Sequence, residues 1–200
     1  ALDARLQAIG VGTQAVDVAQ ERVDDDVRRE CAALFLHVLG EIAREIFPAG
    51  VVNVLSGGDD LGRWMTAHPR IGKIAFTGSV ATGKAIMASA ASTLKRLTLE
   101  LGGNDAAVVL PDFDVERQSE DLFWAGFANN GQVCACMKRT YVPDELYDAV
   151  CRRFAEIAAT VKIGAWDAPD VQIGPLQNRK QHQRVAELVD DAVARGATPY

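Results

Sequence analysis

Residues 73–83 read Lys-Ile-Ala-Phe-Thr-Gly-Ser-Val-Ala-Thr-Gly. The segment 73–77 is apolar enough for a short buried strand, Gly78 permits a sharp turn, and a helix of small residues is expected to run on to Ser92. A second strand is expected at Arg96–Leu101, where a glycine pair stops it. This order of strand, helix and strand is typical of a βαβ unit with parallel strands.

Helices and strands alternate through the rest of the chain as well. The further expected elements are a helix over 31–47, a strand at 51–55, a helix capped by Asp59 or Asp60 and running through His68, a strand at 106–110, a helix capped by Asp114 that ends near Asn129, a strand at 140–142, and helices over 144–160 and 178–194. We therefore predict an α/β fold of βαβ units with a largely parallel sheet.

The composition excludes several classes of protein. Of the 200 residues 48% are hydrophobic, the formal net charge is -6, and no basic stripe is visible, which argues against a nucleic-acid binder. No apolar run reaches the length of a membrane span and no signal peptide is apparent, so we expect no membrane partner and a cytoplasmic location. Cys134 and Cys136 form a lone CxC without a second pair or a histidine at ligand spacing, so no metal site is expected.

The turn after residue 77 has the chemistry of an anion site. Gly78 allows close backbone approach, and Ser79 can either cap the following helix or donate to a phosphate. The spacing from Gly78 to Gly83 matches neither GxGxxG nor a Walker A loop, so a plain capped helix is an equal alternative.

Two further residues have catalytic potential. Glu100 lies in an apolar strand, where burial would raise its pKa toward that of a general base, although a solvent-facing glutamate at a strand edge is the alternative. Cys134 follows the turn Asn-Asn-Gly (129–131), which would expose its thiol. The aromatic residues before it, Phe123, Trp124 and Phe127, are expected in the core rather than in a substrate tunnel.

Three motifs together resemble the aldehyde dehydrogenase superfamily. FTGS (76–79), LELGG (99–103) and GQVC (131–134) occur in the order of its cofactor-loop, glutamate and cysteine signatures, and Gly-Pro-Leu-Gln-Asn (174–178) resembles a further, structural loop of that family. The likeness extends from about Ala32 to the C-terminus; three motifs in the correct order are more specific than any one of them.

The resemblance implies a domain organisation and a reaction. Residues 31–98 would be part of a Rossmann-like NAD(P)-binding domain, residues 99–200 part of an α/β catalytic domain, and residues 1–30 an unmatched segment. Cys134 would attack an aldehyde to give a thiohemiacetal and then a thioester, and Glu100 would activate the water that hydrolyses it. The cofactor, NAD or NADP, would lie near Phe76, Gly78, Ser79 and Leu101.

The resemblance also has limits. Family members are well over twice as long and carry an upstream Pro-Trp-Asn-type segment, an upstream Lys-Pro segment and a downstream Glu-Glu-Ile-Phe-Gly-Pro-type segment, none of which is present here. The chain is therefore expected to be an internal fragment. The resemblance implies that its full-length relatives are homo-oligomers, and it leaves the state of this fragment open. Two alternatives are a non-catalytic remnant that keeps the fold and a CoA-acylating relative, although Glu100 favours hydrolysis over transfer to CoA.

Overall fold

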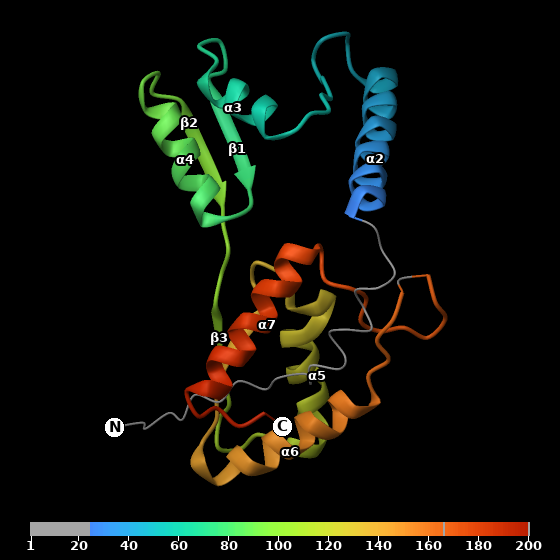
Figure 1. The fold of residues 1–200 in the computed structure, drawn as a ribbon, viewed down its shortest axis with the longest axis vertical. Coiled ribbons are helices and arrows are strands. Elements are labelled where there is room, and N and C mark those ends of the chain that lie inside the picture. Colours follow the sequence, from blue (N-terminus) through green and yellow to red (C-terminus); the bar gives the residue numbers. More distant parts are fainter. Residues whose placement is uncertain (1–24, 166, 200) are drawn as a thin grey trace. The chain divides into compact units, whose positions relative to one another are not determined.

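The computed structural model describes residues 25–165 and 167–199, with side chains from residue 34 onward. The chain divides into two compact units, one comprising residues 26–102 and the other containing residues 103–200. Each unit contains one pair of parallel strands connected through a helix (Figure 1). The predicted α/β class with βαβ units is confirmed.

The unit of residues 26–102 is built around two parallel strands. Its elements are α2 (Asp25–Ile46), α3 (Asp59–Ala67), β1 (Lys73–Thr77), α4 (Val80–Ala91) and β2 (Arg96–Glu100). The strands pair in register from Lys73 with Arg96 to Thr77 with Glu100, and α4 connects them. Helix α4 lies beside β2 (Figure 1) and buries Gly83, Ile86 and Ala90.

A lysine links the helices of this unit. Lys95 is buried, and its Nζ donates to the carbonyl oxygen of His68 at 2.7 Å and to Thr93 Oγ1 at 2.9 Å. His68 ends α3 and Thr93 follows α4, so one ammonium group joins the C-terminal ends of two helices. A positive charge at such an end is favourable because unpaired carbonyls gather there.

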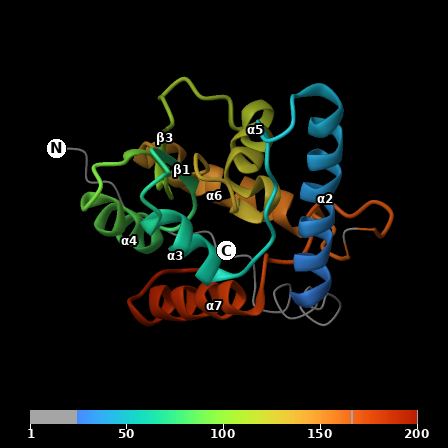
Figure 2. The same ribbon diagram turned by 90° about the horizontal axis from the view of Figure 1, so that it is seen from above.

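The unit that begins at Gly103 also has two parallel strands connected through a helix, but its helices pack differently. Its elements are β3 (Asp105–Val108), α5 (Val115–Phe127), the short 3-10 helix η1 (Ala128–Gly131), β4 (Met137–Tyr141), α6 (Asp144–Thr160) and α7 (Arg179–Ala194). Strands β3 and β4 are parallel, with a register shift between Asp105 and Ala106. Helices α5 and α6 lie side by side in both ribbon views (Figures 1 and 2).

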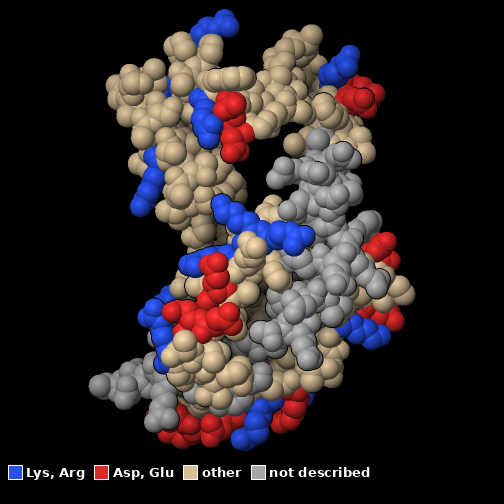
Figure 3. All heavy atoms as spheres, in the orientation of Figure 1, with Lys and Arg blue, Asp and Glu red and all other residues tan. Residues whose placement is uncertain are grey.

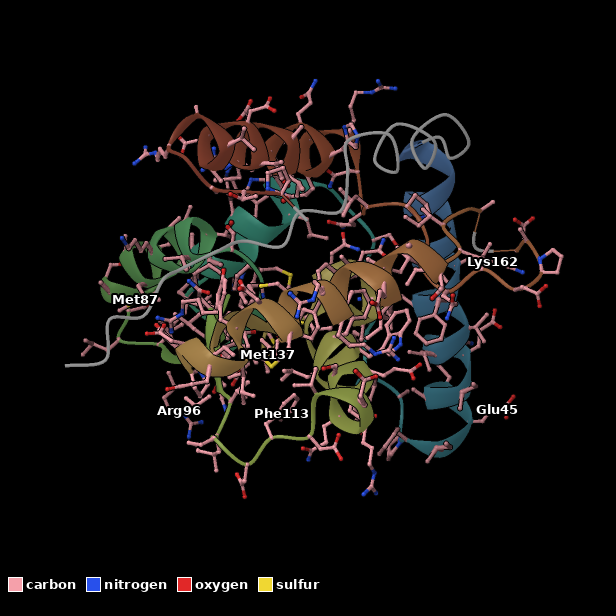
Figure 4. The ribbon with its side chains drawn as sticks, turned by 90° about the horizontal axis from the view of Figure 1, so that it is seen from below. Glu45, Met87, Arg96, Phe113, Met137 and Lys162 are labelled. Carbon is pink, nitrogen blue, oxygen red and sulfur yellow. The ribbon has the colours of Figure 1, made fainter. Side chains whose placement is uncertain are left out.

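Aromatic side chains form the core between α5 and α6. Phe123 is 1% exposed, stacks on Phe127 with ring centroids 4.4 Å apart, and meets Trp124 and Phe154 edge-on. Phe113 packs against the same cluster from the turn before α5 (Figure 4). The prediction that these aromatic residues belong to the core is confirmed.

Some predicted boundaries differ from the structure. Residues 51–55 form no strand, because a β-branched run needs a neighbouring strand to pair with and no described strand pairs with it. Helix α3 begins after Gly58, so Asp59 and Asp60 lie in its first turn rather than at its cap, where their charge still favours the helix dipole. Strands β3 and β4 begin at Asp105 and Met137, earlier than predicted. Asp114 caps α5 as predicted, accepting from the N–H of Arg117.

Candidate functional site

The turn between β1 and α4 is fixed by its neighbours. The Gly78 N–H donates to the carbonyl oxygen of Glu100 at 3.0 Å, which ties the turn to the end of β2. A Cβ on Gly78 would lie 2.5 Å from the Phe76 ring, so only glycine fits there with the ring in place. Phe76, Gly78 and Glu100 therefore meet at one end of the strand pair.

Ser79 begins helix α4 and caps it. Its Oγ accepts from the backbone N–H of Thr82 at 3.1 Å and lies 2.9 Å from Thr82 Oγ1. The structure thus shows the capping role that the sequence allowed. A single cap satisfies only one of the free backbone N–H groups at a helix N-terminus. The first N–H groups of α4, at Val80 and Ala81, lie at the end of the helix where the dipole favours an anion.

Glu100 differs from expectation in its burial. It is the last residue of β2, and its side chain is exposed, so the prediction of a desolvated carboxylate is wrong for this chain and the solvent-facing alternative holds. The reason is the alternation of the strand, in which residues 97 and 99 face inward and 96, 98 and 100 face outward. Leu101 follows it and packs against α4, where a Cβ on Gly83 would lie 2.8 Å from its Cδ2.

Cys134 is the exposed one of the three described cysteines. Cys136 and Cys151 are 3% and 4% exposed and lie in the core of their unit, as predicted for Cys136. The turn around Cys134 is closed by the carbonyl oxygen of Val133, which accepts from the Cys136 N–H at 3.1 Å and from Lys138 Nζ at 2.9 Å. Burial raises the pKa of the Cys151 thiol, which favours its neutral form.

Three consecutive residues before Cys134 have left-handed backbone conformations. Asn129, Asn130 and Gly131 have φ values of 50°, 59° and 68°. This region costs most L-residues roughly 1–2 kcal/mol each, and asparagine and glycine enter it most readily. The Asn-Asn-Gly sequence predicted a turn, but not that all three residues share this conformation.

The second glycine of LELGG lies against the cysteine backbone. A Cβ on Gly103 would collide with the carbonyl oxygen of Cys134. The next residue is held too, because Arg139 donates from Nε and Nη2 to the carbonyl oxygen of Asn104 at 3.1 and 2.8 Å. The sequence alone does not point to Gly103 and Arg139 as site residues, although the glycine pair is a signal for the first of them.

Charge on the visible surface is sparse and mixed. On the face shown in Figure 3, Lys and Arg side chains and Asp and Glu side chains are both present, with wide areas of other residues between them. Within the described residues, no three His, Cys, Asp or Glu side chains are grouped so as to hold a metal ion. No helix in the described part is long and apolar enough to span a bilayer.

Comparison with known proteins places these features in a family. The profile of the Aldehyde dehydrogenase family matches residues 29–200, and the chain therefore belongs to that family. A probable aldehyde dehydrogenase of Pseudomonas sp is 46% identical over 177 residues, which are 88% of this chain and 36% of that protein.

Solved structures agree with this assignment. An NADP dependent enzyme of E. coli has a TM-score of 0.75 and 36% identity, over 79% of this chain and 33% of its own. A mutant of aldehyde dehydrogenase C from Pseudomonas syringae, complexed with NAD+ and octanal, has a TM-score of 0.76 and 32% identity, over 82% and 34%. This chain spans about a third of the length of these relatives.

Proposed function

We propose that the protein to which this chain belongs oxidises an aldehyde to a carboxylic acid with NAD or NADP as hydride acceptor. The observation that carries the proposal is Cys134, an exposed thiol on a conformationally constrained turn in a member of this family. A thiol nucleophile needs access to substrate and a fixed orientation, and the turn supports both. Membership of the family supplies the reaction class.

The proposed chemistry divides between two residues. The Cys134 thiolate attacks the aldehyde carbon and forms a C–S bond, while the backbone N–H of Cys134 is the candidate donor to the oxygen that gains charge. A nicotinamide cofactor held near Phe76, Gly78, Ser79 and Leu101 would supply the acceptor for the hydride of this carbon. Glu100 then removes a proton from water, the water oxygen attacks the resulting thioester, and the C–S bond breaks to release the acid.

The turn before α4 supports the cofactor assignment. The first N–H groups of α4 and the Ser79 hydroxyl form a donor set suited to a pyrophosphate, and Gly78 lets a ligand approach the backbone. Phe76 and Leu101 flank this turn from β1 and from the end of β2. Following the resemblance, we assign residues 31–98 to cofactor binding and residues 99–200 to catalysis, a division that falls within β2 rather than at the boundary between the two compact units.

The relatives inform the choice of ligands. One similar structure was solved with NAD+ and octanal and another is named for NADP, which supports a nicotinamide cofactor and an aldehyde substrate for this protein. Assembly of the full-length protein into a homo-oligomer stays a prediction from the resemblance, and a cytoplasmic location stays a prediction from the sequence.

The proposal is tested by following reduced cofactor during incubation with NAD+ or NADP+ and an aldehyde. We expect Cys134→Ala to abolish the signal and Glu100→Gln to slow release of the acid, because each removes a group that acts on the reacting atoms. Cys151→Ala and Glu120→Gln are matched controls, since they change a buried thiol in α6 and an exposed carboxylate in α5. Activity that survives Cys134→Ala would overturn the proposal.

The same assay distinguishes the two alternative functions. Product that forms only after CoA is added would indicate a CoA-acylating enzyme, and Glu100 argues against this because a base for water is then superfluous. A reactive thiol without cofactor reduction would indicate that this chain keeps the fold without the reaction. The fraction of the relatives' length that it covers is the observation that favours this second outcome for the chain in isolation.

A further inference from the structure

The loop that carries Cys134 is bonded to a loop more than forty residues further along the chain. Asn130 Nδ2 donates to the carbonyl oxygens of Gly174 and Pro175 at 2.6 and 2.9 Å. Gln132 Oε1 accepts from the backbone N–H of Gln177 at 2.9 Å. All of these residues belong to the unit that begins at Gly103.

Gln132 also forms hydrogen bonds within its own loop. Gln132 Nε2 donates to the carbonyl oxygen of Asn129 at 3.3 Å, and the Gln132 N–H donates to that oxygen at 3.0 Å. Asn129 Nδ2 in turn donates to the carbonyl oxygen of Gln132 at 3.3 Å. The amide of Gln132 thus uses its oxygen toward the distant loop and its nitrogen toward the turn.

These bonds explain how the left-handed turn persists. Two non-glycine residues in succession are held at positive φ, and such a conformation survives only where surrounding contacts over-determine it. Asn130 supplies two of these contacts, and both of its acceptors are backbone carbonyls of the 174–175 segment. Residues held in this way cluster at sites where geometry serves chemistry.

We propose that Asn130 and Gln132 are positioning residues, which clamp the Cys134 loop to residues 174–177 and so aim its thiol and backbone N–H for acyl transfer. The two side chains and their acceptors and donor in 174–177 are called the amide clamp. This inference rests on the proposed function of Cys134. It assigns a role in the reaction to a segment that the sequence marked only as structural.

A purely structural role predicts a different outcome. If the amide clamp only stabilised the fold, its loss would lower the unfolding temperature and leave the chemistry of Cys134 unchanged in the molecules that stay folded. A positioning role predicts that attack on a carbonyl, which needs an aligned nucleophile and a donor for the oxyanion, suffers much more than simple alkylation. The two reactions therefore separate the explanations.

The experiment measures both reactions on the 200-residue chain. p-Nitrophenyl acetate acetylates the thiolate and releases p-nitrophenolate as the ester C–O bond breaks, whereas iodoacetamide alkylates the thiol without an oxyanion. Gln132→Ala removes one amide of the clamp, and Gln177→Ala is its matched control because only the backbone N–H of Gln177 takes part in the clamp. Asn130→Gly removes the other amide of the clamp. Because glycine adopts positive φ readily, this variant should fold even if Gln132→Ala does not.

We expect Gln132→Ala and Asn130→Gly to slow acetylation of Cys134 about tenfold or more, with alkylation changed less than about twofold. Gln177→Ala should match the parent chain in both reactions. Equal acetylation in all variants would overturn the clamp, as would an equal loss in Gln132→Ala and Gln177→Ala. A parent chain whose Cys134 acetylates no faster than free cysteine would instead overturn the proposed function, and the clamp's role with it.

Discussion

The two βαβ units of this chain, β1–α4–β2 and β3–α5–β4, place their unusual backbone at opposite ends of the connecting helix. In the first, the tight turn precedes α4 and presents the N-terminus of a helix. In the second, the left-handed turn follows α5 and leads to an exposed cysteine. One unit thus offers backbone N–H groups and the other offers a thiol.

The units also differ in what fixes each turn. Ser79 caps α4 through a residue three positions away, and Gly78 is held by the neighbouring strand. The Cys134 loop is held by residues 174–177, more than forty positions away. A helix cap formed three positions away and a turn bonded to residues more than forty positions away should respond differently to mutation.

The largest difference between the two units is expected when the aromatic core between α5 and α6 is mutated. Phe123→Ala should destabilise the unit that begins at Gly103 by about 3–5 kcal/mol, because it removes a buried ring and leaves a cavity beside Phe154 and Phe127. Hydrogen exchange resolved by segment would show faster exchange in α5 and α6 and little change in β1 and β2. Met87→Ala, at a 55% exposed position on α4 (Figure 4), should change neither unit appreciably. Uniform acceleration in both units would show that they share one core.

The glycine pair of LELGG offers a sharper comparison. Gly103→Ala should cost about 1–3 kcal/mol, because its new methyl would collide with the carbonyl oxygen of Cys134 and force the loop to move. Gly102→Ala places a methyl in open space and should stay within about 1 kcal/mol of the parent. Thermal unfolding and the alkylation rate of Cys134 measure both effects. Identical behaviour of the two variants would show that the close approach is unimportant.

A small gain in stability is expected from a substitution just before β2. Leu94 is 90% exposed and has a φ of 50°, a conformation unfavourable for leucine, so Leu94→Gly should stabilise the chain by about 1 kcal/mol. Leu110→Gly is the matched control, at an exposed site with ordinary backbone, and should be neutral or destabilising. Chemical denaturation would measure the change in the free energy of unfolding for both variants. A loss of stability in both would show that the backbone at Leu94 is not strained.

The smallest effect concerns alkaline pH. Burial raises the pKa of Cys151 above its ordinary value of 9.0, so the unfolded chain loses this proton at a lower pH than the folded chain does. Its contribution to stability is therefore complete below that value and declines as the pH rises through the folded pKa. Cys151→Ala should flatten this part of the stability curve, and an unchanged slope would contradict the assignment.

The local part of this fold could be predicted from the sequence. The strand at Lys73–Thr77, the cap at Asp114 and the helix over Asp144–Thr160 follow from apolar patterns and capping residues a few positions apart. The helix over Val80–Ala91 is also read correctly, because Gly78 and Ser79 mark its start. These signals involve only neighbouring residues.

The rest depended on contacts that a sequence does not display. The run at 51–55 has the composition of a strand, but strand formation needs a partner strand. The exposure of Glu100 depends on which face of β2 is covered. The links of Asn130 and Gln132 to residues 174–177 join segments whose proximity only the folded chain creates.

Site-resolved acylation shows directly whether Cys134 is the nucleophile that we propose. Glu100→Gln should be treated with p-nitrophenyl acetate, quenched in acid, digested and mapped by mass spectrometry, because loss of the water-activating base should let the thioester accumulate. We expect the acetyl group on Cys134, with Cys136 and Cys151 unlabelled in the folded chain. Label spread evenly over Cys134, Cys136 and Cys151, or absent from Cys134, would contradict this role of Cys134.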